Sequence, residues 1–178
     1  MLFARMQRDR EGRRMKLRKL QEKDATFMLE WMHDESVVEF MGANFAEKTL
    51  QDCKKFIEWA QNNDEDLHLA IVDDADEYMG TVSLKHINKE EKIAEFAITV
   101  RKKTMGKGYS AYGMKEILNM GIKELGLSKI YWCVSANNKR AVRFYDKNSY
   151  NRTVDVPDII KKAYTEEQLS GFIWYVYE

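Results

Sequence analysis

Apolar and polar positions alternate with a period of two in several short segments of the chain, and this period is typical of strands. The first such segment spans residues 15–20 (MKLRKL). Later segments carry the β-branched and aromatic residues that strands favour; they span residues 67–73, 79–87, 93–100, 129–137, 150–156 and 172–178. The pattern therefore predicts about seven strands.

Between these strands, apolar residues recur at helical spacing and predict about four helices. Asp24 is a candidate N-cap for the first helix, whose apolar face consists of Phe27, Met28, Trp31 and Met32. The second helix follows Thr49, the third spans residues 109–126, and the fourth spans residues 138–149. This order of elements predicts an α+β fold, with a mostly antiparallel mixed sheet and one strand–loop–helix–strand crossover.

The length of 178 residues fits one domain. Residues 1–14 are polar and arginine-rich without periodicity, so we expect a flexible N-terminal extension there. Residues 15–178 are expected to form a single domain. One proline and nine glycines leave little room for flexible linkers inside it.

Charge and cysteine content narrow the class of protein. The 29 Lys and Arg residues balance the 29 Asp and Glu residues, so we expect no nucleic-acid partner held by bulk electrostatics. No apolar run approaches the ~20 residues of a membrane helix, and the N-terminus lacks the features of a signal peptide. No Cys/His cluster has zinc spacing. We expect a cytoplasmic protein with no membrane partner and no metal; a homodimer is compatible with these features.

A basic loop with two glycines joins the strand at residues 93–100 to the helix that starts at residue 109. Gly106 and Gly108 allow tight turning and close backbone approach. The free N–H groups of the first helical turn point into this loop, with the positive end of the helix dipole behind them. Further positive charge comes from Arg101, Lys102, Lys103 and Lys107. The loop is either a plain turn or an anion cradle suited to a diphosphate.

A second group of residues lies further along, in the segment SANNKRAVRFYDKNSY. Tyr145 ends the short helix there, so its phenol is free to point back across the carboxyl end of the preceding strand. A tyrosine has an unperturbed pKa of about 10, so at neutral pH it can donate a proton to a departing thiolate. A packed surface aromatic is the alternative for Tyr145 taken alone.

Together, MGKGYS and NNKRAVRFYDKNSY resemble motifs A and B of the GNAT superfamily of acetyl-CoA-dependent N-acetyltransferases. The resemblance extends from Met15 to the end of the chain and includes the order of elements. The segment MKLRKLQEKDATFMLEWMHD is similar to the opening of the branch that contains ribosomal-protein N-terminal acetyltransferases and amino-sugar acetyltransferases. The resemblance implies a GNAT-like fold with a splayed central strand pair, and acetyl-CoA as co-substrate.

Carried over by position, the resemblance assigns coenzyme binding to a six-residue loop, which consists of Met105, Gly106, Lys107, Gly108, Tyr109 and Ser110. Met105 and Ser110 depart from the family pattern, in which Gln or Arg and a small residue are usual. Backbone amides do most of the pyrophosphate binding, so these departures need not abolish it. Ser149 also stands where the family usually has glycine.

The resemblance further implies that the strand before the loop pairs with the pantetheine arm of the coenzyme, through the backbone of Ile98 and Val100. Asn138 matches the asparagine that contacts the coenzyme arm, and Ala141 matches a small residue beside it. Tyr145 matches the tyrosine that protonates the leaving sulfur.

The implied reaction is direct attack of a neutral amine on the acetyl thioester, so a base or a water chain must accept a proton. Glu95 is the candidate base, because it precedes the coenzyme-binding backbone on the same strand; an exposed strand carboxylate is the alternative. His86 is the other titratable option near neutral pH. Candidate substrate contacts are Trp31, His33 and His86.

Three functions stay open at this point. A small-molecule N-acetyltransferase, acting on an amino sugar for example, is favoured by the neutral charge. It is also favoured by a set of aromatic and apolar residues, which are Trp31, Phe40, Met41, Phe45, Trp174 and Tyr175. A protein N-terminal acetyltransferase with a peptide acceptor is the second, and a non-catalytic acyl-CoA-binding module is the third. A pocket closed by the insertion at residues 158–170 favours the small molecule, whereas a groove open at both ends favours the peptide.

Overall fold

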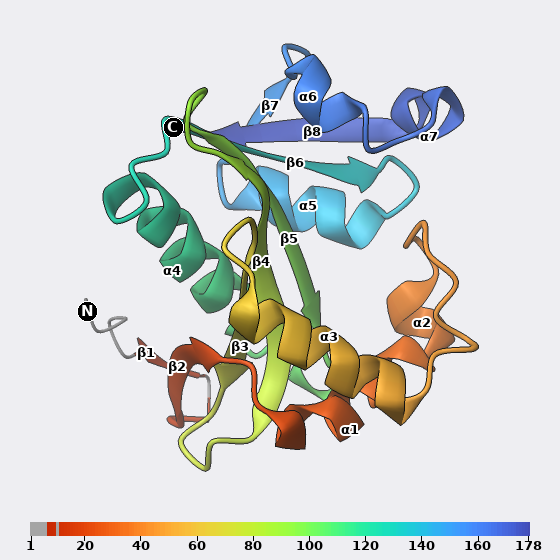
Figure 1. Ribbon diagram of the computed structural model, residues 1–178, viewed down its shortest axis with the longest axis vertical. Coiled ribbons are helices and arrows are strands. Elements are labelled where there is room, and N and C mark those ends of the chain that lie inside the picture. The colour runs from red at the N-terminus through yellow and green to blue at the C-terminus, as the bar shows by residue number, and fades with distance from the viewer. Residues whose placement is uncertain (1–6, 10) are drawn as a thin grey trace.

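One eight-stranded sheet organises the fold (Figure 1). The computed structural model describes residues 7–9 and 11–178. The strands are β1 (Gln7–Arg8), β2 (Arg14–Lys19), β3 (Leu67–Val72), β4 (Tyr78–Asn88), β5 (Ile93–Val100), β6 (Lys129–Ser135), β7 (Asn151–Thr153) and β8 (Phe172–Tyr177). They follow the order β1-β2-β3-β4-β5-β6-β8-β7, and every neighbouring pair is antiparallel except β5 and β6. The predicted mixed sheet is confirmed, with β1 as an additional edge strand.

The described residues form seven α-helices, which are α1 (Ala25–Met32), α2 (Glu35–Val38), α3 (Leu50–Asn62), α4 (Tyr109–Lys123), α5 (Lys139–Lys147), α6 (Asp158–Lys161) and α7 (Glu166–Ser170). Two 3-10 turns span Glu22–Asp24 and Lys102–Thr104. The four predicted helices correspond to α1, α3, α4 and α5. The other three are single short turns, and so leave little apolar periodicity in the sequence. None of the helices in the described ranges combines the length and apolar character that a membrane span requires.

Helices cover both faces of the sheet through separate hydrophobic clusters. Ile71 of β3 packs with the α4 residues Ile117 and Leu118, whereas the next residue, Val72, packs with α1 and α3. Because successive strand residues point to opposite faces, α4 lies on one face and the α1–α3 pair on the other. α4 approaches the sheet closely at Gly113, where a Cβ would lie 2.4 Å from Cδ1 of Ile71. A third cluster joins α6 to β6 and β8.

Asp24 is the N-cap of α1, as the sequence predicts, but its carboxylate makes no capping bond to the helix. It instead accepts the N–H of Gln21 at 2.8 Å and two guanidinium bonds from Arg18 at 2.7 and 2.9 Å. A charged guanidinium competes successfully for the carboxylate because charge-assisted bonds are stronger than neutral ones. Thr49, by contrast, caps α3 in a reciprocal box with Asp52.

β5 and β6 separate after a short parallel contact. Residues 93–95 of β5 pair with residues 129–131 of β6. Beyond that point β5 pairs only with β4, and β6 pairs only with β8. The predicted splayed central pair is therefore confirmed, and it leaves residues 96–100 with one edge open towards β6.

The extension predicted for residues 1–14 falls partly outside the described residues, which exclude 1–6 and 10. Gln7 and Arg8 form β1 and pair with Met15 and Arg14 of β2. The boundary between an extension and a single domain over residues 15–178 stays a prediction.

Candidate active site

The open edge of β5 presents backbone groups to the gap between β5 and β6. At one end of the strand, the N–H of Arg101 donates to the Met79 carbonyl of β4 at 2.9 Å. At the other end, the Lys92 carbonyl accepts the N–H of Ser128 at 2.6 Å, just before β6. Because backbone groups alternate in direction along a strand, the even-numbered residues Ile98 and Val100 point their N–H and C=O groups into the gap. This edge offers hydrogen bonds to an extended ligand.

The loop after β5 has the backbone of an anion site. Gly106 and Gly108 adopt φ values of 78° and 97°, a left-handed conformation that side chains other than glycine rarely adopt. Gly108 is the N-cap of α4 and provides no capping side chain, so the first N–H groups of this 15-residue helix lack a side-chain acceptor. A Cβ built at either glycine meets nothing within 4 Å, so the space beside the loop is open. The loop therefore has backbone donors without a side-chain acceptor and open space beside them, and its role as an anion cradle stays a prediction.

The expectation that Arg101 adds charge to this cradle is wrong. Its guanidinium is buried and donates to both carboxylate oxygens of Glu30, at 2.9 and 2.8 Å, and to Glu77 at 2.6 Å. It also lies 4.3 Å from the ring centroid of Phe27. Because two carboxylates and the Tyr78 carbonyl accept its hydrogen bonds, the Arg101 guanidinium is turned away from the loop. Arg101 therefore connects the end of β5 to α1 and to the start of β4. Lys103 likewise pairs with Glu77.

Tyr145 lies at the C-terminal end of α5, in an aromatic cluster with Trp132 and Tyr175 at ring-centroid distances of 5.6 and 5.1 Å. Its side chain is 7% exposed, and burial raises the pKa of its phenol well above the ordinary value. The phenol is therefore protonated at neutral pH. Within the described ranges no side chain hydrogen-bonds to its hydroxyl. A protonated phenol without a partner is able to act as a donor to a ligand.

Asn138 and Ala141 lie at the start of the same helix. The Asn138 side-chain oxygen accepts the N–H of Ala141 at 3.1 Å and so caps α5. This bond fixes the side-chain amide where β6 gives way to the helix, and its N–H₂ group has no partner within the described residues. Ser149 follows α5 with a φ of 62°. This left-handed backbone is the physical reason why glycine is favoured there.

Glu95 is buried on β5, with 2% of its surface exposed. The hydroxyl of Tyr164 donates to its Oε1. His86 Nε2 lies 3.7 Å from Oε2, and Lys85 Nζ lies 3.9 Å from Oε1. Oε2 itself has no hydrogen-bond partner although it is buried. The exposed strand carboxylate considered as the alternative is therefore excluded, and one buried carboxylate oxygen is left to receive a proton donor.

Tyr164 is a site residue that the sequence did not indicate. It lies between α6 and α7, in the insertion at residues 158–170, and packs its ring against Phe172 and Trp174. The insertion has no periodicity, so no sequence signal connects this tyrosine with a carboxylate on β5. The side chain of Cys133 lies beside the same pair; burial is the main cause that raises the pKa of its thiol to about 12.

The remaining predicted substrate residues lie apart from this group. Trp31 is 6% exposed, packs against Phe45, and donates its indole N–H to the buried Tyr78 hydroxyl at 3.1 Å. His33 ends α1, where its Nε2 lies 2.8 Å from the Lys48 carbonyl. Of the three predicted contacts, only His86 approaches Glu95.

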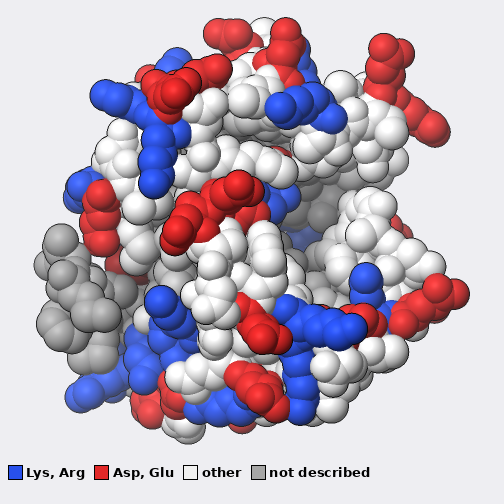
Figure 2. Space-filling view, viewed as in Figure 1, with Lys and Arg blue, Asp and Glu red and all other residues white. Residues whose placement is uncertain are grey.

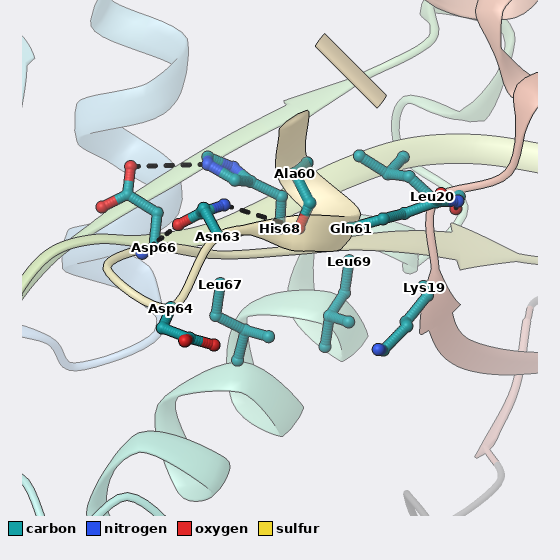
Figure 3. A pocket seen from close by; sticks show the side chains of 10 residues that line it. All are labelled: Lys19, Leu20, Ala60, Gln61, Asn63, Asp64, Asp66, Leu67, His68 and Leu69. Carbon is teal, nitrogen blue, oxygen red and sulfur yellow. Dashed lines mark hydrogen bonds and ion pairs between the residues drawn. The ribbon is translucent and has the colours of Figure 1, made fainter. Parts of the chain in front are cut away.

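The surface of the protein has a hollow between α2 and α5 (Figure 2). A separate pocket of about 150 Å³ lies where α3 ends and β3 begins (Figure 3). Asn63, Asp66 and His68 line it, but none of the predicted coenzyme or catalytic residues does. His68 Nδ1 lies 2.7 Å from the Ser83 hydroxyl, in keeping with a structural role.

Comparison with known proteins agrees with this geometry. Residues 14–151 match the family model described as "Acetyltransferase (GNAT) domain". Spermidine N(1)-acetyltransferase of Escherichia coli K12 is 27% identical over 142 residues, which cover 77% of this chain and 73% of that protein.

No metal-binding cluster of His, Cys, Asp or Glu occurs among residues 7–9 and 11–178.

Solved structures share the fold. Spermidine N-acetyltransferase from Vibrio cholerae, in complex with CoA and spermine, superposes with a TM-score of 0.70 at 21% identity, covering 78% of this chain and 82% of that one. A dodecameric structure of spermidine N-acetyltransferase from the same organism gives a TM-score of 0.66 at 19% identity, with 92% of each chain covered.

Proposed function

Because the chain belongs to the GNAT family of N-acetyltransferases, we propose that it transfers the acetyl group of acetyl-CoA to a small aliphatic amine. The observation that carries the proposal is the buried Glu95 carboxylate, which stands beside the β5–β6 gap with one oxygen unpaired. A protonated amine supplies both the hydrogen-bond donor and the charge that such an oxygen lacks. The similarity to spermidine acetyltransferases supports an acceptor of the polyamine type.

Burial removes several of the predicted aromatic faces on which an amino sugar would stack. Trp31, Trp174 and Tyr175 are buried in the hydrophobic clusters, so they offer no face to a sugar ring. Phe40, with 42% of its surface exposed, is left as a face for stacking. The insertion also reaches Glu95 through Tyr164, which supports a site closed around a small molecule over a groove open to a peptide.

We assign coenzyme binding to the free backbone donors of the splayed edge and the loop. The backbone of Ile98 and Val100 is suited to pair with the pantetheine arm. The Gly106 and Gly108 backbone and the first turn of α4 are suited to the diphosphate. The amide of Asn138 provides a further donor from α5. The open space beside both glycines fits this assignment.

The bound ammonium group first gives one proton to Glu95, directly or through a water molecule, which leaves a neutral amine. The amine nitrogen then forms a bond to the thioester carbonyl carbon. The carbon–sulfur bond breaks, and the departing sulfur takes the proton of the Tyr145 hydroxyl. The second proton of the nitrogen passes to the resulting phenolate through water. Backbone N–H groups of β5 that face the gap are placed to stabilise the oxyanion formed between these steps.

An acceptor screen tests the proposal. Spermidine, a short diamine, glucosamine and an N-terminal peptide are each incubated with acetyl-CoA, and thiol release is followed. We expect turnover with the aliphatic amines and its loss in the Glu95→Gln variant. Turnover confined to glucosamine or to the peptide contradicts the proposed acceptor. Coenzyme binding without turnover of any amine points instead to a non-catalytic acyl-CoA-binding module.

A further inference from the structure

A turn outside the family-matched region contacts the coenzyme loop at two points. The family match begins at residue 14. The turn just before it, which we call the N-terminal turn, comprises residue 9 and residues 11–13, and it connects β1 to β2. Asp9 contacts Tyr109, and Glu11 contacts Lys107. Tyr109 and Lys107 both belong to the loop assigned to the diphosphate. The N-terminal turn therefore contacts the proposed diphosphate site from outside the family-matched region.

Asp9 is a fully satisfied, buried carboxylate. Its side chain has no exposed surface. Oδ1 accepts the backbone N–H groups of Glu11 and Arg13 at 2.9 and 2.8 Å, and Oδ2 accepts Arg13 Nε at 2.8 Å. The fourth donor is the hydroxyl of Tyr109 at 3.0 Å, across 100 residues of sequence. The turn therefore closes around one carboxylate and presents it to the loop.

Tyr109 transmits this contact to the backbone of the cradle. It is the first residue of α4 and follows Gly108, the N-cap. The side chain of Tyr109 is fully buried. The packing of this side chain therefore fixes the position of the Tyr109 backbone N–H. A hydrogen bond at the tip of that side chain fixes the orientation of the first helical turn. The donors that face a diphosphate thus depend on an anchor outside the loop.

Glu11 acts on the same loop with the opposite effect. Its Oε1 lies 2.9 Å from Lys107 Nζ, between the two glycines of the cradle. A diphosphate that enters the loop would attract this ammonium group and would be repelled by the Glu11 carboxylate. Both side chains are solvent-exposed, at 49% for Glu11 and 38% for Lys107, so their pairing is weak and easily exchanged. The other carboxylate oxygen of Glu11 pairs with Arg13 Nη2 at 2.6 Å.

We infer that the N-terminal turn sets the affinity of the protein for its coenzyme: Asp9 is a positioning residue that acts through Tyr109, and Glu11 competes with the diphosphate for Lys107. The inference rests on the proposed role of residues 105–110 as the diphosphate site. It assigns a coenzyme function to residues that precede the family-matched region.

Calorimetric titration of the full chain with coenzyme A tests the anchoring role of Asp9. Asp9→Asn removes the charge that holds Tyr109, and Tyr109→Phe removes only the hydroxyl; each is expected to weaken binding about fivefold to tenfold. The double variant is expected to bind no more weakly than Asp9→Asn alone, because the contact that Tyr109→Phe breaks is one of those that Asp9→Asn already weakens. Tyr109→Phe keeps the packing of the ring, so it remains informative where Asp9→Asn fails to fold.

The competing role of Glu11 predicts a change of opposite sign. Glu11→Gln is expected to tighten coenzyme binding about threefold at low salt, with a smaller gain at high ionic strength. The matched control is Glu124→Gln, which changes the net charge equally at the other end of α4. Equal affinity of these two variants overturns the competition.

Wild-type affinity in Asp9→Asn and in Tyr109→Phe overturns the positioning role, provided that the wild-type protein binds coenzyme A. A wild-type protein that shows no binding at millimolar coenzyme A overturns the proposed function itself. The two failures are thereby distinguished by the same titration.

Discussion

The hydroxyl of Tyr164 donates a hydrogen bond to the buried carboxylate of Glu95 across 69 residues of sequence. One partner lies on β5, which presents its open edge to the gap between β5 and β6. The other lies in the insertion between β7 and β8. The contact joins this insertion to the residue proposed to accept the proton. Catalysis should therefore depend on a residue of the insertion.

Tyr164→Phe removes this hydrogen bond and leaves Oε1 of Glu95 with only the distant Lys85 ammonium. We expect kcat to fall about tenfold while the KM for acetyl-CoA stays unchanged, because a bond to a charged group contributes about 1.5–3 kcal/mol. In a Glu95→Gln background the same change should have little further effect. Tyr177→Phe is the matched control, because its hydroxyl makes only a 3.4 Å contact with Asn119. A tenfold loss in both single variants, or in neither, contradicts the prediction.

Tyr145→Phe removes the proposed acid and keeps the aromatic packing. Turnover should fall ~10²-fold or more, because the thiolate then leaves without a proton. The dissociation constant for coenzyme A should remain close to the wild-type value. A thiol-release assay measures turnover, and calorimetry on the same preparation measures the dissociation constant. Unaltered turnover would remove Tyr145 from the mechanism.

Ser149→Gly is expected to stabilise the protein. Ser149 has a φ of 62°, a region that costs an L-residue roughly 1–2 kcal/mol and glycine almost nothing. Part of the gain is offset by the greater freedom of glycine in the unfolded chain, so we expect about 0.5–1 kcal/mol in the free energy of unfolding. Urea denaturation measures this change, and Ser149→Ala should bring no such gain. Equal stability of the two variants argues against backbone strain at this position.

The carboxyl of Asp9 predicts a specific loss of stability in acid. Burial opposes its ionisation, but bonds from Arg13, Tyr109 and Glu11 outweigh this and lower its pKa from the ordinary value of 3.8 to about 2. A depressed pKa contributes stability above the unfolded-state value, and this contribution is lost as the pH falls from 3.8 towards 2. The stability difference between wild type and Asp9→Asn should therefore shrink over this range. A difference that stays constant from pH 5 to pH 2 would contradict the prediction.

Local patterns in the sequence were sufficient for most of the fold. The strand at residues 93–100 and the start of α4 at Tyr109 lie where alternation and the glycine loop placed them. Thr49 caps its helix with a partner only three residues away. Asp24 is the N-cap that the sequence predicts, although its carboxylate binds Arg18, six residues away. Arg101 behaved differently, because its carboxylate partner Glu30 lies 71 residues away in the sequence.

The sequence by itself determined the longer helices, most of the strands, the family and the two motifs, because hydrophobic periodicity, glycine conformation and helix capping act within a few residues of the chain. Only the tertiary structure decided which charges remain available to a ligand. Arg101 is neutralised by Glu30, 71 residues away, and Asp9 accepts a hydrogen bond from Tyr109, 100 residues away. Hydrogen bonds between residues so far apart form only after the chain has folded, and no local pattern encodes them.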